Sequence, residues 1–212
     1  MSNEAEESPL AGGGRTVVAR RGSVVVRETG PWASTVHSLL RHLEAVGFEG
    51  APGVIGSGFD AQGREVLTYV EGEIMNPPPW TDDGIAGLGA LLRRLHDATA
   101  SYQPPTGAIW RPWFGRQVGT ADIIGHCDAA PWNIISRQGQ PVALVDWEVA
   151  GPVDRLTELA MAAWNNAQLY DDDVAEMNGL PDAAARIRQV RIFAEAYGLP
   201  RQRRASACLS DD

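Results

Sequence analysis

The residues best suited to chemistry lie in one stretch, Ile123 to Glu148. It carries a carboxylate at Asp128, an amide at Asn133 and a second carboxylate at Asp146. Mg²⁺ in proteins prefers hard oxygen ligands and takes one or two carboxylates together with substrate phosphates. A carboxylate beside such an ion can accept a proton from an attacking hydroxyl group. We therefore expect Asn133 and Asp146 to bind Mg²⁺ and Asp128 to act on the hydroxyl group.

Two short apolar runs must position these side chains. Asn133–Ser136 and Pro141–Val145 flank the turn-forming sequence at 137–140, a pattern that predicts a β-hairpin of buried strands. The polar residues come before or at the start of the first strand and directly after the second. Folding of the hairpin would therefore bring them together at its open end.

Composition restricts the class of protein. The chain has 212 residues, 44% of them hydrophobic, which is enough for a sizeable core in one domain or two small lobes. Its net charge of −9 suits a cationic small molecule and argues against a nucleic-acid partner. Cys127 and Cys208 lack metal-ligand spacing, and no apolar segment follows a basic N-terminus. We expect a cytoplasmic protein with no membrane partner.

All 18 basic residues are arginine. A phosphate-binding P-loop needs a lysine after its second glycine, so Gly12-Gly13-Gly14 cannot form one. Residues 1–14 combine this glycine run with several glutamates and serines, which predicts a disordered tail.

The first third of the chain predicts a small sheet with one helix. Two β-branched runs between Thr16 and Glu28 indicate a hairpin, and further strands are expected at 53–59 and 65–70. The helix between them has Ser34 as its expected N-cap and Gly47 at its C-terminal end.

The rest of the chain is predicted to be mainly helical. A helix is predicted at 82–97, with Thr81 as its cap. Further helices are predicted directly after Asp154, which would cap that helix, and at 183–197. Asp171 to Asp173 are expected to lie in a solvated loop, with binding of an amine-bearing substrate as the alternative.

At residues 126–133, HCDAAPWN, and 146–148, DWE, the sequence resembles the aminoglycoside phosphotransferase and choline kinase-like family. The two segments match the family's His-x-Asp-x-x-x-x-Asn motif and its metal-binding aspartate. The resemblance covers residues 16–200. It implies a two-lobed α+β protein-kinase-like fold, with a small antiparallel sheet and one helix in the N-lobe and a mainly helical C-lobe.

By this resemblance the N-lobe would span residues 15–72 and the C-lobe residues 73–200, with 201–212 as an irregular tail. ATP and Mg²⁺ would bind in the cleft between the lobes. Asp128 would be the catalytic residue and Asn133 and Asp146 the metal ligands.

The resemblance also implies a phosphate-binding cation. In the family a lysine on the strand before the helix reaches the nucleotide phosphates and pairs with a helix glutamate. Here the corresponding residues would be Arg27 and Glu44. We expect Glu44 to face the sheet, with a solvated position on the helix as the alternative. Arg20 or Arg21 could take the place of Arg27.

The resemblance implies roles for further residues. Backbone groups of Tyr69, Val70 and Glu71, near the hinge, would bind adenine. Residues with a structural role at the site would be His126, Glu148 and Asp154.

The expected function is ATP-dependent phosphorylation of a hydroxyl group on a small, aminoglycoside-like or amino-alcohol-like molecule. The alternative is a nucleotide-binding but catalytically inactive or truncated relative that acts as a binding module. The missing lysine favours this alternative, and so does the segment after residue 200, where relatives usually continue with more helices.

Overall fold

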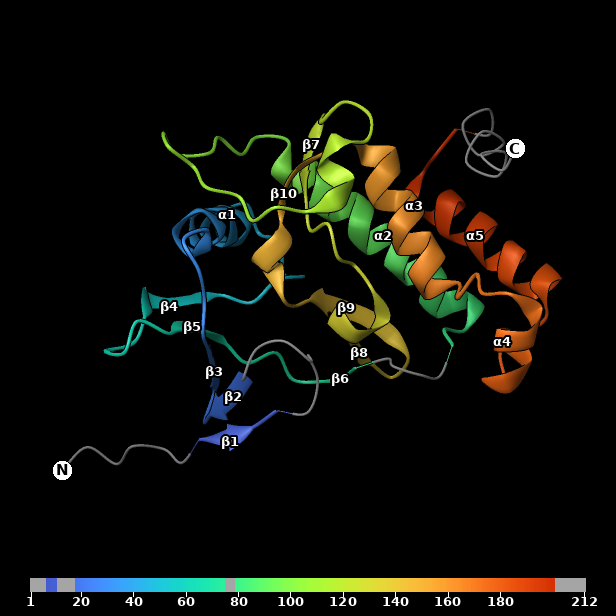
Figure 1. The fold of residues 1–212 in the computed structure, drawn as a ribbon, viewed down its shortest axis with the longest axis horizontal. Helices are drawn as coiled ribbons and strands as arrows, with labels where there is room; N and C mark the ends of the chain where they lie inside the picture. Colours follow the sequence, from blue (N-terminus) through green and yellow to red (C-terminus); the bar gives the residue numbers. More distant parts are fainter. Residues whose placement is uncertain (1–6, 11–17, 75–78, 201–212) are drawn as a thin grey trace.

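The computed structural model describes residues 7–10, 18–74 and 79–200 (Figure 1). The fold is α+β, as predicted, with the larger sheet at one end of the molecule and the long helices at the other. Several sequence predictions lie outside the described residues: those for Gly12-Gly13-Gly14, Cys208 and the tail at 201–212.

An antiparallel five-stranded sheet forms the N-terminal part, in the order β1-β2-β3-β5-β4. Its strands are β1 (Ser8–Pro9), β2 (Val18–Arg21), β3 (Val24–Arg27), β4 (Val54–Phe59) and β5 (Glu65–Thr68). The predicted β2–β3 hairpin is confirmed. Within the segment 1–14, which we expected to be disordered, Ser8 and Pro9 form β1 and pair with β2.

Helix α1 (Ala33–Ala45) packs against β4. Its buried face repeats at helical spacing, at Val36, Leu39, Leu40 and Leu43. The helix ends before Gly47, which has the predicted left-handed conformation with φ of 78°. The prediction of Ser34 as N-cap is wrong, because the helix begins at Ala33 after Trp32, without a side-chain cap.

The C-terminal part contains two small sheets and four helices among the described residues. The strands are β6 (Glu73–Ile74), β7 (Ile123–Gly125), β8 (Ile134–Arg137), β9 (Gln140–Leu144) and β10 (Gly151–Val153). The helices are α2 (Asp82–Thr99), α3 (Arg155–Asn166), α4 (Asp172–Met177) and α5 (Ala183–Tyr197). The predicted β8–β9 hairpin is confirmed, and β6 adds to it as a third strand.

Side-chain caps begin α2 and α3 where the sequence predicts them. Thr81 Oγ1 accepts a hydrogen bond from Gly84 N at 3.1 Å, and Asp154 Oδ1 accepts one from Thr157 N at 2.9 Å. The solvated loop expected at Asp171 to Asp173 is wrong in part, because Asp172 and Asp173 form the first turn of α4.

Helix α2 carries the centre of the core. It packs along α5 and also contacts β7 and β9. Its face toward these elements is fully buried, at Ile85, Leu88, Leu91, Leu92 and Leu95. Within the ranges that the structure describes, none of the helices combines the length and apolar character needed to cross a bilayer.

The segment from Ala100 to Asp122 leads from α2 to β7 and contacts α1 on the way. It runs along the upper edge in Figure 1 and past α1. Tyr102 OH donates to Thr35 O at 3.4 Å, and Thr35 Oγ1 accepts from Ile109 N at 2.9 Å.

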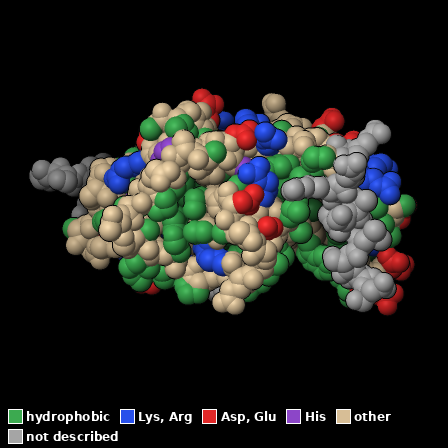
Figure 2. Space-filling view, turned by 90° about the horizontal axis from the view of Figure 1, so that it is seen from above, with side chains coloured by type: hydrophobic (Ala, Val, Ile, Leu, Met, Phe, Trp, Pro, Cys, Tyr) green, Lys and Arg blue, Asp and Glu red, His purple; other side chains and the backbone are tan. Residues whose placement is uncertain are grey.

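Viewed from above, the molecule shows separate hydrophobic patches among mixed charges (Figure 2). The exposed hydrophobic side chains of the segment are Ile109, Phe114 and Val118.

We expect Leu92→Ala to lower the free energy of unfolding by about 2–5 kcal/mol, because it leaves a cavity at the centre of the α2 core. Urea denaturation monitored by circular dichroism measures this loss. The control is Ile187→Ala on α5, whose side chain is 46% exposed and should change stability by less than about 0.5 kcal/mol. Equal losses in the two variants would contradict this account of the core.

Candidate active site

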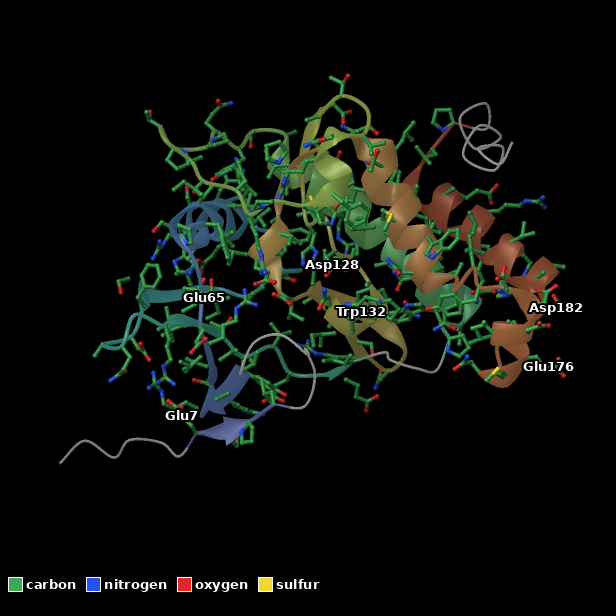
Figure 3. All side chains as sticks on the ribbon, in the orientation of Figure 1. Glu7, Glu65, Asp128, Trp132, Glu176 and Asp182 are labelled. Carbon is green, nitrogen blue, oxygen red and sulfur yellow. The ribbon has the colours of Figure 1, made fainter. Side chains whose placement is uncertain are left out.

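The open end of the β8–β9 hairpin brings the sequence-predicted residues together. Asn133 Nδ2 donates to Asp128 Oδ2 at 2.9 Å and to Asp128 O at 3.0 Å. Val145 N donates to Asn133 O at 2.9 Å, which places the next residue, Asp146, beside Asn133. Figure 3 shows Asp128 between the five-stranded sheet, where Glu65 lies, and the helices.

His126 holds the loop that carries Asp128. Its Nδ1 accepts from Asp128 N at 3.3 Å, so Nε2 carries the proton and donates to Val145 O at 2.9 Å. Burial lowers the pKa of His126 despite the neighbouring carboxylates, so the ring is neutral at pH 7. It also packs edge-on against Trp147, with ring centroids 4.7 Å apart. These contacts fix the direction of the loop between the two carboxylates.

Glu158 on α3 supports the same loop, and the sequence did not reveal it. Its Oε1 accepts from Cys127 N at 2.8 Å, and its Oε2 lies 2.8 Å from His96 Nε2. Tyr197 OH lies 2.8 Å from His96 Nδ1. Gly125 is required for this approach, because a Cβ there would lie 1.9 Å from the Glu158 carboxylate.

The buried Glu158 carboxylate is ionised. Burial alone would raise its pKa, but the electrostatic attraction of His96, together with hydrogen bonds from His96 and Cys127, outweighs burial and lowers the pKa below its ordinary value. A buried carboxylate with its partners in place therefore links α2, α3 and α5 to the loop before Asp128.

Cys127 departs from a relaxed loop conformation. Its φ is 66°, in the left-handed region that costs a non-glycine residue about 1–2 kcal/mol. The side chain packs against Ile123 and Val153, which offsets part of this cost. Burial raises the pKa of the Cys127 thiol, so it is not a nucleophile at neutral pH.

Arg27 lies at the centre of a second buried network. Its Nε donates to Glu65 and its Nη1 donates to Asp146. His37 Nε2 on α1 lies 2.9 Å from the other oxygen of Glu65. Burial would lower the pKa of Arg27, but the two carboxylates more than offset it and raise the pKa. Arg27 thus connects the sheet to the end of the hairpin as a permanent cation.

The predicted pairing of Arg27 with Glu44 is wrong. Glu44 is exposed on α1, whereas Glu65 lies directly opposite Arg27 in the register of β3 and β5. Residues paired across antiparallel strands point to the same face, so the sheet itself supplies the partner carboxylate. The alternative cation Arg20 instead pairs with Glu71 at 2.7 Å, and Arg21 lies 3.5 Å from Glu7.

Glu148 is paired with a second arginine. Arg111 forms an ion pair with Glu148, and its guanidinium lies 4.7 Å from the centre of a Trp32 ring. Burial and the nearby Asp146 raise the pKa of Glu148, although Arg111 opposes them. Each of the two carboxylates after β9 therefore contacts one guanidinium, and Arg27 is shared with Glu65.

Backbone groups of the predicted hinge residues form hydrogen bonds within the protein. Tyr69 N donates to Ser23 O at 2.8 Å, and Glu71 O accepts from Arg137 Nε at 2.9 Å. A half-open cavity of about 650 Å³ lies beside this segment, lined in part by Val70 and Arg137. Asp128 and Asn133 do not line it, so this cavity is separate from the candidate site.

The donor set fits a divalent ion that also binds substrate oxygens. Among the residues described by the structure, no group of three or more His, Cys, Asp or Glu side chains could hold a metal ion. Asn133 directs its Nδ2 at Asp128, which leaves its Oδ1 as a hard ligand beside Asp146. An ion held by one carboxylate and one amide needs phosphate oxygens to complete its shell.

Comparisons with known proteins indicate the family of the chain. Residues 120–205 match the model of the phosphotransferase enzyme family. A curated relative, the trifolitoxin immunity protein of Rhizobium leguminosarum bv. trifolii, is 58% identical over 200 residues, which are 94% of this chain and 77% of the relative.

Solved structures share the fold at low sequence identity. An amicoumacin kinase in complex with AMP-PNP, Ca²⁺ and amicoumacin has a TM-score of 0.66 at 15% identity, over 90% of this chain and 71% of that one. The macrolide 2'-phosphotransferase of Brachybacterium faecium has a TM-score of 0.60 at 15% identity, over 96% and 80%. A choline/ethanolamine kinase family protein from Mesorhizobium loti has a TM-score of 0.54 at 18% identity, over 90% and 75%. The predicted protein-kinase-like fold is confirmed.

We expect stability to fall with acidification below pH 4.5, the ordinary pKa of a glutamate side chain. The folded-state pKa of both Glu65 and Glu158 is depressed, so their stabilisation is complete above 4.5 and is lost as the pH falls through the folded values. Urea denaturation at a series of pH values measures the slope.

In Glu158→Gln this acid dependence should be smaller than in the wild type, because one depressed carboxylate is gone. Glu176→Gln, a change of the same kind on the surface of α4, is the matched control and should keep the wild-type slope. An unchanged slope in Glu158→Gln would show that this carboxylate is not selectively ionised in the folded protein.

Proposed function

Because the chain belongs to the phosphotransferase enzyme family, we propose that it transfers the γ-phosphoryl group of a nucleoside triphosphate to a hydroxyl group of a small molecule. The observation that carries the proposal is the hydrogen-bonded pair of Asp128 and Asn133 with Asp146 beside it. This set combines a proton acceptor with hard oxygen ligands, as phosphoryl transfer requires.

Asp128 is the proposed proton acceptor. The acceptor oxygen forms a bond to the γ-phosphorus as the bond from that phosphorus to the β-γ bridging oxygen breaks, and the hydroxyl proton passes to the Asp128 carboxylate. The nucleoside diphosphate leaves with the bridging oxygen. Asn133 orients Asp128 through its Nδ2, while His126 and Glu158 hold the loop from either side.

Arg27 is proposed to bind phosphate oxygens. Its contacts with Glu65 and Asp146 use two of the five N–H donors of a guanidinium, so the group can bind phosphate while it stays anchored. Asn133 and Asp146 would hold a divalent ion. When bound, that ion would neutralise charge on the phosphates and orient them.

A toxin or antibiotic is the proposed acceptor. The 58% identical relative is named as an immunity protein against a toxin, and solved structures of the same fold are named as kinases of amicoumacin and of macrolides. Phosphorylation of a hydroxyl group adds up to two negative charges, which would prevent a toxin from binding its target.

A catalytically inactive nucleotide-binding protein is the second candidate. The observation that favours it is the direct contact of Arg27 with Asp146, which engages a proposed metal ligand. Binding of nucleotide without transfer would support this candidate over the enzyme.

We expect purified protein with Mg²⁺ and ATP or GTP to phosphorylate at least one member of a panel of hydroxylated antibiotics and amino alcohols, detected by mass spectrometry. Asp128→Asn should lower kcat by about 10²–10⁴-fold, because the proton acceptor is lost. Asp83→Asn removes the same charge from an exposed position in the first turn of α2 and should keep full activity. The proposal fails if the wild type binds neither nucleotide, or if Asp128→Asn remains as active as the wild type.

A further inference from the structure

Any cation that binds Asp146 must share this carboxylate with Arg27. Arg27 Nη1 contacts Asp146 Oδ1, and the guanidinium side chain is only 10% exposed, whereas that of Asp146 is 38% exposed. Arg27 also cannot move away easily, because its Nε is held by Glu65. Glu65 in turn is 2% exposed and held by His37. The positive charge beside Asp146 is therefore built into the structure.

Both carboxylates after β9 contact a guanidinium. Arg27 contacts Asp146 as well as Glu65, and Arg111 pairs with Glu148. A free divalent ion at Asp146 would be repelled by the guanidinium that contacts the same carboxylate, although Glu65 offsets part of this repulsion. It would also find few protein ligands, because the site supplies one amide and one carboxylate for a shell of six.

We propose that Arg27 acts as an internal counter-cation that excludes free divalent ions from Asp146 and admits them together with nucleotide phosphates. The inference rests on the proposed function for the identity of the second ligand. Phosphate oxygens accept hydrogen bonds from the remaining guanidinium N–H groups and bring enough negative charge to offset the added ion. Metal and nucleotide binding are thereby coupled through a single side chain.

Removal of the guanidinium charge should change the two affinities in opposite directions. In Arg27→Gln, Mn²⁺ alone should bind at least about tenfold more tightly than to the wild type, since one partly screened unit charge no longer repels it. Nucleotide without metal should bind at least about tenfold more weakly, since a charge-assisted phosphate contact is lost. Electron paramagnetic resonance of free Mn²⁺ measures the first affinity, and fluorescence titration with a labelled nucleotide measures the second.

The controls separate charge from structure and locate the ion. Arg93→Gln removes the same charge from an exposed position on α2 and should leave both affinities unchanged. Arg27→Gln with Glu65→Gln removes the buried carboxylate that the single change would leave unpaired, and it should also bind Mn²⁺ more tightly than the wild type. Adding Asp146→Asn to Arg27→Gln should abolish the gain in Mn²⁺ affinity.

Wild-type protein that binds Mn²⁺ alone as tightly as Arg27→Gln would overturn the inference, and so would Mn²⁺ binding to neither protein. A purely structural role of Arg27 predicts that both affinities fall. The Mn²⁺ comparison needs neither nucleotide nor transfer, so it remains decisive even if the wild type phosphorylates no acceptor and the proposed function fails.

Discussion

The ionic link from Arg27 to Asp146 is the constraint that defines the site, because it joins the five-stranded sheet directly to the β8–β9 hairpin. Buried charges are tolerated only when they are paired, and removal of one partner typically costs about 3–5 kcal/mol. Such a pair adds little net stability compared with apolar packing, but it permits few alternative geometries. The position of the sheet relative to the loop that carries Asp128 therefore depends on where Arg27 can reach both Glu65 and Asp146.

Helix α1 also restrains the position of Arg27. Thr35 binds the segment that leads from α2 to β7, and His37, two residues further along the helix, binds Glu65. His37 can approach the sheet because Gly58 carries no side chain; a Cβ there would lie 2.3 Å from the imidazole. The helix is thus fixed to both parts of the molecule, and a shift of α1 would disturb the carboxylate that anchors Arg27.

Much of this arrangement is encoded locally, and the sequence predicted that part. The turn at 137–140 brings Asn133 and Asp146 together, and the helix caps at Thr81 and Asp154 follow from side chains within three residues. Partners set by strand register or by packing between distant elements could not be predicted in this way. The pairing of β7 with β10 and the contact of Glu158 with Cys127 depend on such tertiary packing, and neither was predicted from the sequence.

Two departures from the family pattern have one physical explanation. An arginine replaces the lysine, and the helix does not supply the partner carboxylate. With Glu44 exposed, the acidic partner of the cation comes from the neighbouring strand, at Glu65. A lysine is a single point charge on a flexible stem, whereas a guanidinium presents separate N–H groups along a rigid plane. Arg27 uses this plane to hold Glu65 through Nε and Asp146 through Nη1 at the same time. A lysine would have to reach both carboxylates from a single nitrogen, whereas the guanidinium contacts them through two separate nitrogens.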